Sequence, residues 1–334
     1  MAERILSLFR HHGGRVNTAR TAFPSAPLPW IDLSTGISPF PWPGQGADDL
    51  TVLPDPDDIA DLEKVAATYF GSADQPIAAL PGADMGLRLL PQLITARSVA
   101  IVSPTYQGHV EAWRDAGADV TLISQDALAT CEAQVVVLVN PNNPDGKATE
   151  VTEVLEILRR QQSRNGWLIV DESFADVMPE ISVAAHAQRG LVVLRSFGKF
   201  FGLPGARLGF VVGDCEILKA IRHVTGAWPV NVNALRLGKE AYGDFAWHRQ
   251  TRAQLAADAK RLDGLLKDHG FAVCGGTSLF RLVSCADAEK AFLGLAEKGI
   301  LVRPFDYAPN WLRFGIPRAD QWVRVANALA ECRP

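Results

Sequence analysis

The sequence predicts an α/β protein whose main sheet is mostly parallel and is covered by helices on both faces. Between residues 98 and 213, short runs rich in Val, Ile and Leu alternate with helical patterns, and this alternation is typical of parallel sheets. Several runs are almost continuously apolar, as strands are when both faces of their sheet are buried. After residue 244, a long helical pattern followed by short strands and helices predicts a smaller α+β domain.

These patterns also predict where the individual strands and helices lie in the sequence. In the main sheet we expect strands at Ser98–Ser103, Asp119–Ser124, Gln134–Asn140, Trp167–Asp171, Leu191–Ser196 and Leu208–Val212, with helices at Gln107–Ala116 and Glu150–Arg164. In the C-terminal region we expect helices at Asp244–His269, at Ala286–Lys298 and from Ala319, with strands at Phe271–Cys274, Leu279–Ser284, Ile300–Arg303 and Leu312–Phe314. The first residues are rich in Pro, Gly and Trp and predict an irregular arm. The expected organisation is therefore an arm at 1–45, a large domain at 46–243, and the long helix with a small domain at 244–334.

Composition narrows the class of protein. The 334 residues include 33 basic and 37 acidic side chains, a net charge of −4, which speaks against a nucleic-acid or anionic-membrane surface. No run reaches the roughly 18 apolar residues of a membrane span, and the N-terminal stretch lacks the apolar core of a signal peptide. The five cysteines form no C-x-x-C pair. We therefore expect a soluble, cytoplasmic protein without a metal site.

Polar residues follow the apolar runs at several strand ends, where open parallel sheets bind their ligands. The segment Pro-Asn-Asn-Pro-Asp-Gly at 141–146 follows the run Val135–Val139, and by itself it is equally typical of a simple turn. Asp171 ends the next strand, where a carboxylate serves either as a helix cap or as a functional group. Neither of these two patterns indicates a function by itself, and each becomes informative only in combination with the features described next.

Lys199 comes just after the strand Leu191–Ser196, among aromatic and glycine residues. Most lysines lie on solvated surfaces, but burial lowers the pKa of an amine and makes it nucleophilic, as Schiff-base chemistry requires. The segment Leu80–Gly86 opens an apolar helix with a glycine before it, and free N–H groups at such a helix start bind anions. It matches neither a dinucleotide-binding loop nor a Walker loop.

The order and spacing of these features are more specific than any one of them. Asn143 and Asp171 are 28 residues apart, as are Asp171 and Lys199, and Arg207 follows Lys199 by 8. Together they meet the needs of pyridoxal phosphate: an acid for the pyridine nitrogen, a donor for the phenolic oxygen, a lysine for the imine, and cations with a helix start for the phosphate.

These residues resemble those of the fold type I pyridoxal-phosphate enzymes, in the class I and II aminotransferase branch. The resemblance implies a seven-stranded, mostly parallel sheet, a small C-terminal α+β domain, and pyridoxal 5'-phosphate as the cofactor. It implies that Lys199 forms the Schiff base, that Asp171 pairs with the pyridine nitrogen and that Asn143 binds the phenolic oxygen. Further residues implied at the cofactor are Tyr106 on the ring, and Ala83, Asp84, Ser196 and Arg207 at the phosphate.

Within this branch, the chain looks most like the threonine-phosphate decarboxylases of cobalamin biosynthesis, and next like the histidinol-phosphate aminotransferases. His12-Gly13-Gly14 is typical of the decarboxylases, and so is Phe174, where the aminotransferases usually have a tyrosine. The resemblance implies decarboxylation of L-threonine O-3-phosphate to (R)-1-aminopropan-2-yl phosphate. The first alternative is a histidinol-phosphate-type aminotransferase. A non-catalytic cofactor-binding scaffold protein and a cofactor-free Schiff-base aldolase are alternatives of other classes.

For the substrate, the resemblance implies that Arg313, in Trp-Leu-Arg-Phe-Gly-Ile-Pro, binds the α-carboxylate with its guanidinium fork. Arg303 and His12 are expected at the substrate phosphate. A structural ion pair for Arg303 and a hydrogen bond within the arm for His12 remain open alternatives. Gly36 stands where relatives often have an asparagine near the substrate, and Asn143 is expected to contact the substrate as well.

The resemblance also implies a homodimer with the active site at the subunit interface. Leu53 departs from the family pattern, because relatives have a tyrosine there that reaches the partner subunit's cofactor phosphate. We therefore expect that one contact between subunits is missing. Gly198 likewise stands where a hydroxyl residue commonly supports the cofactor phosphate, which predicts fewer side-chain donors at that group.

Overall fold

The computed structural model of the chain describes residues 2–46 and 50–332. It divides into two compact units, which are treated separately here. The small unit comprises Met1–Pro41, Pro144–Gly146 and Arg249–Pro334, and the large unit comprises Trp42–Asn143 and Lys147–His248. The first 41 residues, which the sequence set apart as an arm, thus belong to the same compact unit as the C-terminal residues.

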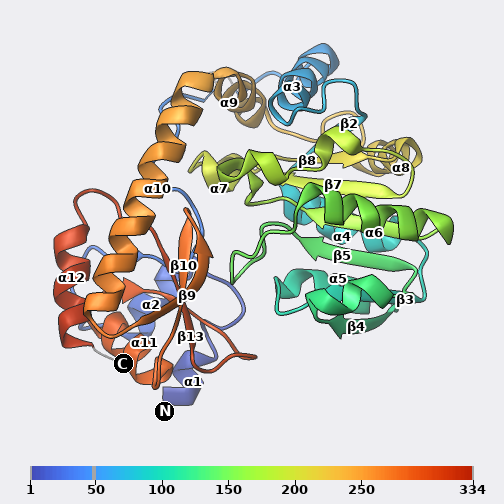
Figure 1. The fold of residues 1–334 in the computed structure, drawn as a ribbon. Coiled ribbons are helices and arrows are strands. Elements are labelled where there is room, and N and C mark those ends of the chain that lie inside the picture. The colour runs from blue at the N-terminus through green and yellow to red at the C-terminus, as the bar shows by residue number, and fades with distance from the viewer. Residues whose placement is uncertain (1, 47–49, 333–334) are drawn as a thin grey trace. The chain divides into compact units, whose positions relative to one another are not determined.

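A seven-stranded sheet forms the centre of the large unit (Figure 1). Its strands are β2 (Ile77–Leu80), β3 (Ser98–Val102), β4 (Asp119–Ile123), β5 (Val135–Val139), β6 (Trp167–Asp171), β7 (Leu191–Ser196) and β8 (Gly209–Gly213), in the order β2-β8-β7-β6-β5-β3-β4. Only β8 runs against its neighbours β2 and β7, while the pairs from β7 to β4 are all parallel. This confirms the predicted mostly parallel sheet.

Helices cover both faces of this sheet. The large unit contains α3 (Pro56–Tyr69), α4 (Ala83–Leu93), α5 (Gln107–Asp115), α6 (Val151–Ser163), α7 (Phe197–Phe200), α8 (Cys215–Thr225) and α9 (Val232–Gly243). Short 3-10 turns lie at Gln125–Thr130, Ala175–Val177, Pro179–Ile181, Ala184–His186 and Pro204–Ala206. On one face, α4, α5 and α8 pack against alternate strand residues such as Val135 and Val137. The residues between them, such as Val136, point to the opposite face because side chains alternate along a strand, and α6 packs on β6 there.

The small unit is an α+β domain around an antiparallel sheet. It contains α1 (Ala2–Leu6), α2 (Val16–Ala22), β1 (Ile31–Asp32), β9 (Ala272–Thr277), β10 (Phe280–Ser284), α11 (Ala288–Glu297), β11 (Ile300–Leu301), β12 (Arg303–Pro304), β13 (Trp311–Gly315) and α12 (Trp322–Glu331). The long helix α10 (Phe245–Asp268) begins in the large unit and continues into the small one. The sheet order is β12-β13-β10-β9, and β1 pairs separately with β11 in parallel.

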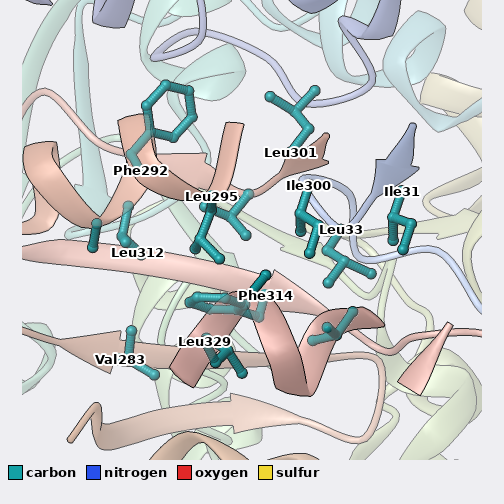
Figure 2. Close-up of a cluster of buried hydrophobic side chains, with 14 of the residues drawn as sticks. Ile31, Leu33, Val283, Phe292, Leu295, Ile300, Leu301, Leu312, Phe314 and Leu329 are labelled. Carbon is teal, nitrogen blue, oxygen red and sulfur yellow. The ribbon is translucent and has the colours of Figure 1, made fainter. Parts of the chain in front are cut away.

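The core of the small unit explains why the N-terminal residues belong to it. Ile31 and Leu33 are buried in one cluster with Phe314 of β13 and Leu329 of α12, and Figure 2 shows these side chains packed together. Leu6 and Phe9 belong to the same cluster. Burial of each such side chain contributes about 1.5–3 kcal/mol, so the apolar residues of the first segment hold it against elements that come over 250 residues later in the sequence.

The structure differs from the sequence expectations at a few elements. The expected strand Ile300–Arg303 is two short strands, β11 and β12, which pair with different partners, β1 and β13. The strand β2 and the helix α3 carried no prediction, because a four-residue apolar run and a helix that begins in a Pro- and Asp-rich stretch give weak periodic signals. No helix among the residues described is long and apolar enough to cross a membrane.

Candidate functional site

The central strands of the large sheet end at one edge, and predicted site residues such as Asp171 and Ser196 lie there. Asp171 is the last residue of β6 and lies opposite Leu194 of β7, two residues before Ser196. The N–H of Asn140, just after β5, donates to the carbonyl of Asp171 at 2.9 Å. Parallel strands that end together place the loops that follow them side by side. The edge therefore gathers groups that are separate in the sequence.

The start of α4, where the sequence predicts a phosphate site, lies at the same edge. Gly82 caps the helix with φ 98°, a conformation that favours glycine, and Ala83 and Asp84 occupy its first turn. Gly209 of β8 pairs with Leu80 on one side and with Ser196 on the other. Since β8 joins the two strands, the predicted phosphate residues Ala83 and Ser196 are neighbours across a single strand.

Arg207 forms a corner with this helix start. It has left-handed backbone angles (φ 54°) and precedes β8 by two residues. A Cβ atom placed on Gly82 would lie 2.7 Å from Nη2 of Arg207, so the guanidinium sits against the start of α4. Helix N–H groups and a guanidinium that converge on one point suit a phosphate. The residues predicted for the cofactor phosphate thus meet in the structure.

Asp171 is held in its ionised form. It is 5% exposed, and burial by itself would raise the pKa of its carboxyl. Hydrogen bonds from Nε2 of His109 at 2.9 Å and from the N–H of Ser173 at 2.9 Å outweigh burial and hold the pKa below its usual value. His109 donates here, because an ionised carboxylate only accepts. An ionised acid at this place is what a protonated pyridine nitrogen requires.

Tyr106 caps the start of α5, beside the same group of residues. Burial raises the pKa of its phenol to about 12, and the charges of Asp84 and Asp171 add to this effect. Its ring meets that of His109 edge-on at 6.3 Å. The loop before it is tied to the loop after β5, since Thr105 donates to Asn142 at 3.0 Å and Asn142 donates to the carbonyl of Pro104 at 2.8 Å.

Lys199 lies on the single-turn helix α7, directly after β7. Its ammonium is 5.6 Å from the centre of the ring of Phe174, the residue that distinguishes the two family branches in the sequence. Asn143 is half-buried in the loop that follows β5, at the point where the chain passes into the small unit. Asp171 ends β6, and Lys199 and Asn143 lie just beyond the ends of the two strands beside it, β7 and β5.

Steric crowding by the neighbouring backbone explains why position 198 is a glycine. A Cβ atom there would lie 2.8 Å from Cα of Pro204, closer than real Cβ atoms approach backbone. The 3-10 turn Pro204–Ala206 packs directly on α7, and a hydroxyl side chain does not fit between them. The missing phosphate donor is thus a consequence of how this turn, which leads to Arg207, is placed.

The small unit brings the predicted substrate residues together. Arg303 of β12 lies directly opposite Arg313 of β13 in the antiparallel register, and both side chains are buried. Like charges in such a pair repel. Burial and the charge of Arg303 lower the pKa of Arg313 to about 9. An anion bound next to these two buried guanidinium groups would reduce the repulsion between their charges.

The N-terminal residues approach the same pair. Arg303 donates to the carbonyls of Phe9, at 3.1 Å, and of His11, which directly precedes His12. Arg313 donates to the carbonyl of Ser34 at 2.9 Å. A Cβ atom on Gly13 would lie 2.4 Å from that same carbonyl oxygen, so the His-Gly-Gly segment packs directly against Ser34.

Gly36 is buried two residues further on, in the loop that packs on Gly315 of β13. This loop follows Ser34, the residue whose carbonyl accepts from Arg313. The predicted set of His12, Gly36, Arg303 and Arg313 is therefore connected within one unit.

Two further side chains at these places were not singled out from the sequence. His109 is one, because nothing in its helical neighbourhood marks it as the partner of Asp171. Tyr307 is the other: burial raises the pKa of its phenol, while the charges of Arg313 and Arg303 act in the opposite direction. Its ring is tilted by 46° against that of Phe305, with the ring centres 5.4 Å apart. An aromatic hydroxyl within a turn such as Asp306–Asn310 gives no periodic signal.

Comparison with known proteins adds to this geometry. A family model described as aminotransferase class I and II matches residues 45–329. The chain is 41% identical over 328 residues to a threonine-phosphate decarboxylase of Pseudomonas aeruginosa, covering 95% of this chain and 96% of the relative. It is 40% identical over 329 residues to a threonine-phosphate decarboxylase of a Sinorhizobium species, covering 96% and 97%.

A solved structure has the same fold. The histidinol-phosphate aminotransferase from Sinorhizobium meliloti in complex with pyridoxal-5'-phosphate superposes with a TM-score of 0.82 at 19% identity, over 95% of this chain and 93% of that one. The family match spans both compact units and includes Asp171, Lys199 and Arg313. From its sheet, its strand-end residues and these matches, the chain belongs to the class I and II aminotransferase family.

Proposed function

We propose that this protein is a pyridoxal-phosphate-dependent decarboxylase that converts L-threonine O-3-phosphate to (R)-1-aminopropan-2-yl phosphate and CO₂ in cobalamin biosynthesis. The observation that carries this choice is the identity of 40–41%, over nearly the full length of both chains, to proteins named threonine-phosphate decarboxylase. The substrate has two anionic groups, and the opposed pair Arg303 and Arg313 supplies two buried cations for them.

The residues of the large unit fit the cofactor. The start of α4, Ser196 and Arg207 converge where its phosphate would bind, and the ionised Asp171 would pair with the pyridine nitrogen. Asn143 would donate to the phenolic oxygen, and Tyr106 would lie on the ring. When bound, the cofactor supplies an electron sink for the electron pair left on the substrate Cα.

Lys199 has two proposed roles. Its amine would attach the cofactor covalently before the substrate amine replaces it. Once released, the amine would take up the proton of the substrate's ammonium group and, as an ammonium, deliver it to Cα after CO₂ has left. The electron pair of the broken bond to the carboxylate would stay on Cα and form the new C–H bond, so no oxidant or reductant is needed. Phe174, whose ring centre lies 5.6 Å from this nitrogen, is apolar and has no hydroxyl that could donate the proton in place of the amine.

The small unit would select the substrate. Arg313 would bind the α-carboxylate, while Arg303 and His12 would bind the side-chain phosphate, with Gly36 leaving room beside them. A fixed carboxylate decides which bond at Cα stands perpendicular to the ring, and thus whether CO₂ or a proton leaves. Positioning, and no additional reactive group, would separate a decarboxylase from an aminotransferase.

We also propose that the protein is a cytoplasmic homodimer with its active site at the subunit interface. Leu50, Val52 and Leu53 support this, because their apolar side chains are more than half exposed in the single chain. Leu53 occupies the place of the tyrosine that crosses to the partner in relatives, so an apolar contact would replace a phosphate contact there.

A histidinol-phosphate-type aminotransferase is the second candidate, favoured by the fold shared with the Sinorhizobium meliloti enzyme. The test supplies purified holoenzyme with L-threonine O-3-phosphate alone and measures CO₂ and aminopropanol phosphate. Turnover without 2-oxoglutarate supports the decarboxylase, and turnover of histidinol phosphate that requires 2-oxoglutarate supports the aminotransferase. Borohydride trapping of the cofactor without turnover of either would indicate a scaffold protein. Lys199→Ala is the control and should lose all turnover.

A further inference from the structure

A buried ion triad lies next to the proposed cofactor site, and none of the roles above uses it. Arg195 of β7 donates through Nη1 to Oε2 of Glu172 at 2.7 Å and through Nη2 to Oδ1 of Asp176. The three side chains, in the order Arg195, Glu172 and Asp176, are 3%, 0% and 2% exposed. Glu172 also accepts from the hydroxyl of Ser182 at 2.6 Å and from the N–H of Val183 at 2.7 Å.

The position of the triad in the chain is its most informative property. Glu172 directly follows Asp171, and Arg195 directly precedes Ser196 and comes four residues before Lys199. The N–H of Glu172 donates to the carbonyl of Leu194 at 2.9 Å. The triad therefore joins the carboxyl ends of β6 and β7 at the residues adjacent to those proposed to hold the ring and its phosphate.

An aromatic layer extends the triad towards α7. The guanidinium of Arg195 lies 4.4 Å from the centre of the Phe70 ring, which meets Tyr242 edge-on at 5.3 Å. Tyr242 in turn contacts Phe197, the first residue of α7, at 5.4 Å. The helix that carries Lys199 is thus packed on the same group of side chains that covers Arg195.

Stability alone does not account for such a triad. Removing charges from water is costly, and well-packed apolar side chains often replace buried ion pairs without loss of stability. Burial raises the pKa of the Glu172 carboxyl in spite of the opposing charge of Arg195. What bidentate ion pairs provide over apolar contacts is a defined geometry between the elements that they join.

We infer that Arg195, Glu172 and Asp176 are positioning residues for the cofactor site: they set the offset between β6 and β7, and with it the placement of Asp171 relative to Ser196 and Lys199. The inference rests on the proposed assignment of Asp171 and Lys199 to the cofactor. It adds that the site tolerates little change of this offset, because the acid must meet the ring nitrogen while the lysine meets the opposite side of the ring.

The test compares Glu172→Gln, which keeps the shape of the side chain and removes its charge, with the control Leu218→Ala. Leu218 is buried in α8 of the same unit, away from the strand ends, so its truncation reduces stability without touching the triad. Both holoenzymes are characterised by urea unfolding, by the dissociation constant of pyridoxal phosphate, and by the visible circular dichroism of the bound cofactor. A chromophore gives that last signal only when it is held asymmetrically.

We expect Glu172→Gln to weaken cofactor binding about tenfold, equivalent to about 1.4 kcal/mol. Its visible circular dichroism should fall and its kcat should drop, at an unchanged KM for the substrate, which the small unit binds. Leu218→Ala should lose comparable stability and keep the wild-type dichroism. Arg195→Lys, which keeps a cation without the fork, should lie between wild type and Arg195→Met.

Two results would overturn the inference. One is loss of stability in Glu172→Gln with an unchanged cofactor affinity and dichroism, which would make the triad purely structural while leaving the proposed function intact. The other is failure of borohydride to trap the cofactor on Lys199 in the wild-type protein. This second result would refute the proposed cofactor site together with the triad's role.

Discussion

At the scale of single residues, the role proposed for Asp171 at the cofactor depends on keeping its carboxyl charged in a buried place. A carboxylate that loses water becomes protonated unless hydrogen bonds replace the lost solvation. His109 and the N–H of Ser173 supply them. The side chain is therefore ready for a cationic ring nitrogen before any cofactor binds, which is the preorganisation that electrostatic stabilisation needs.

Asp171→Asn tests this arrangement. The amide cannot stabilise a protonated ring nitrogen, so turnover should fall about a hundredfold or more while the protein still folds. The contribution of Asp171 to the free energy of unfolding of the cofactor-free protein should also depend on pH. The pKa of Asp171 is lowered in the folded state, so its contribution is present above the ordinary carboxyl pKa of about 3.9 and is lost as the pH falls through the lower folded value.

Urea unfolding at pH 6 and pH 3 measures this contribution. At the higher pH, wild type should be more stable than Asp171→Asn by about 1–3 kcal/mol, the cost of an impaired buried hydrogen bond. The difference should shrink at the lower pH. A constant difference at both pH values would show that the lowered pKa has no part in stability.

At the scale of elements, the phosphate corner depends on how a strand, a turn and a helix start meet. Gly82 provides the left-handed turn into α4, Gly209 lets β8 approach that turn, and Arg207 closes the corner. A Cβ atom on Gly209 would lie 2.3 Å from the backbone nitrogen of Ala83. Because Gly209 has no side chain, the backbone of β8 can lie directly against the start of α4. The N–H groups of α4 are then next to the guanidinium of Arg207.

Gly82→Ala tests this corner, with Gly71→Ala as the matched control. Both glycines have left-handed backbone angles, φ 98° and φ 68°, so each alanine should cost about 1 kcal/mol or more of stability. Only at Gly82 would the new methyl group displace Arg207, whereas the space around Gly71 is open. We expect the affinity for pyridoxal phosphate to fall in Gly82→Ala alone, as measured by titration. Equal affinities in the two variants would contradict a phosphate site at α4.

At the scale of the whole molecule, neither unit is one continuous stretch of chain: the small unit consists of three segments and the large unit of two. Residues 144–146 belong to the small unit, although the residues on either side belong to the large one. Gly146 has φ 71°, and a Cβ atom there would lie 2.2 Å from the carbonyl oxygen of Gly276, so this short segment packs tightly on β9. Asn143 therefore directly precedes a segment that is anchored in the unit containing Arg303 and Arg313, the arginines proposed to bind the substrate.

The proposed dimer is tested at this scale by Leu53→Asp. A carboxylate in an apolar interface must lose its water, so the dimer dissociation constant should rise at least tenfold, about 1.4 kcal/mol. Leu122→Asp is the control, because Leu122 is also exposed but lies on the edge strand β4. Sedimentation or light scattering at several concentrations gives the constants. A wild-type protein that stays monomeric at micromolar concentration would refute the dimer itself.

Much of the large unit follows from local sequence patterns. The strands β6 and β7 have the predicted bounds, because continuous apolar runs between polar ends define buried strands. The sequence also indicated that Asn143, Asp171 and Lys199 come at the ends of consecutive strands, and the structure has β5, β6 and β7 at these places; the roles of the three residues at the cofactor stay predictions. Phe174 and His12 were recognised through the family resemblance, since neither has a local pattern that indicates a role.

By itself, the sequence determined the fold class, the sheet and the chemical groups at its strand ends, because these depend on periodicity and on residue type. Only the tertiary structure decided which groups meet. His109 and Asp171 are 62 residues apart, and Arg303 faces Arg313 only because β12 and β13 pair in one register. The triad joins Glu172 to Arg195 across two strands. Such contacts depend on register and on close backbone approach, which no local pattern contains.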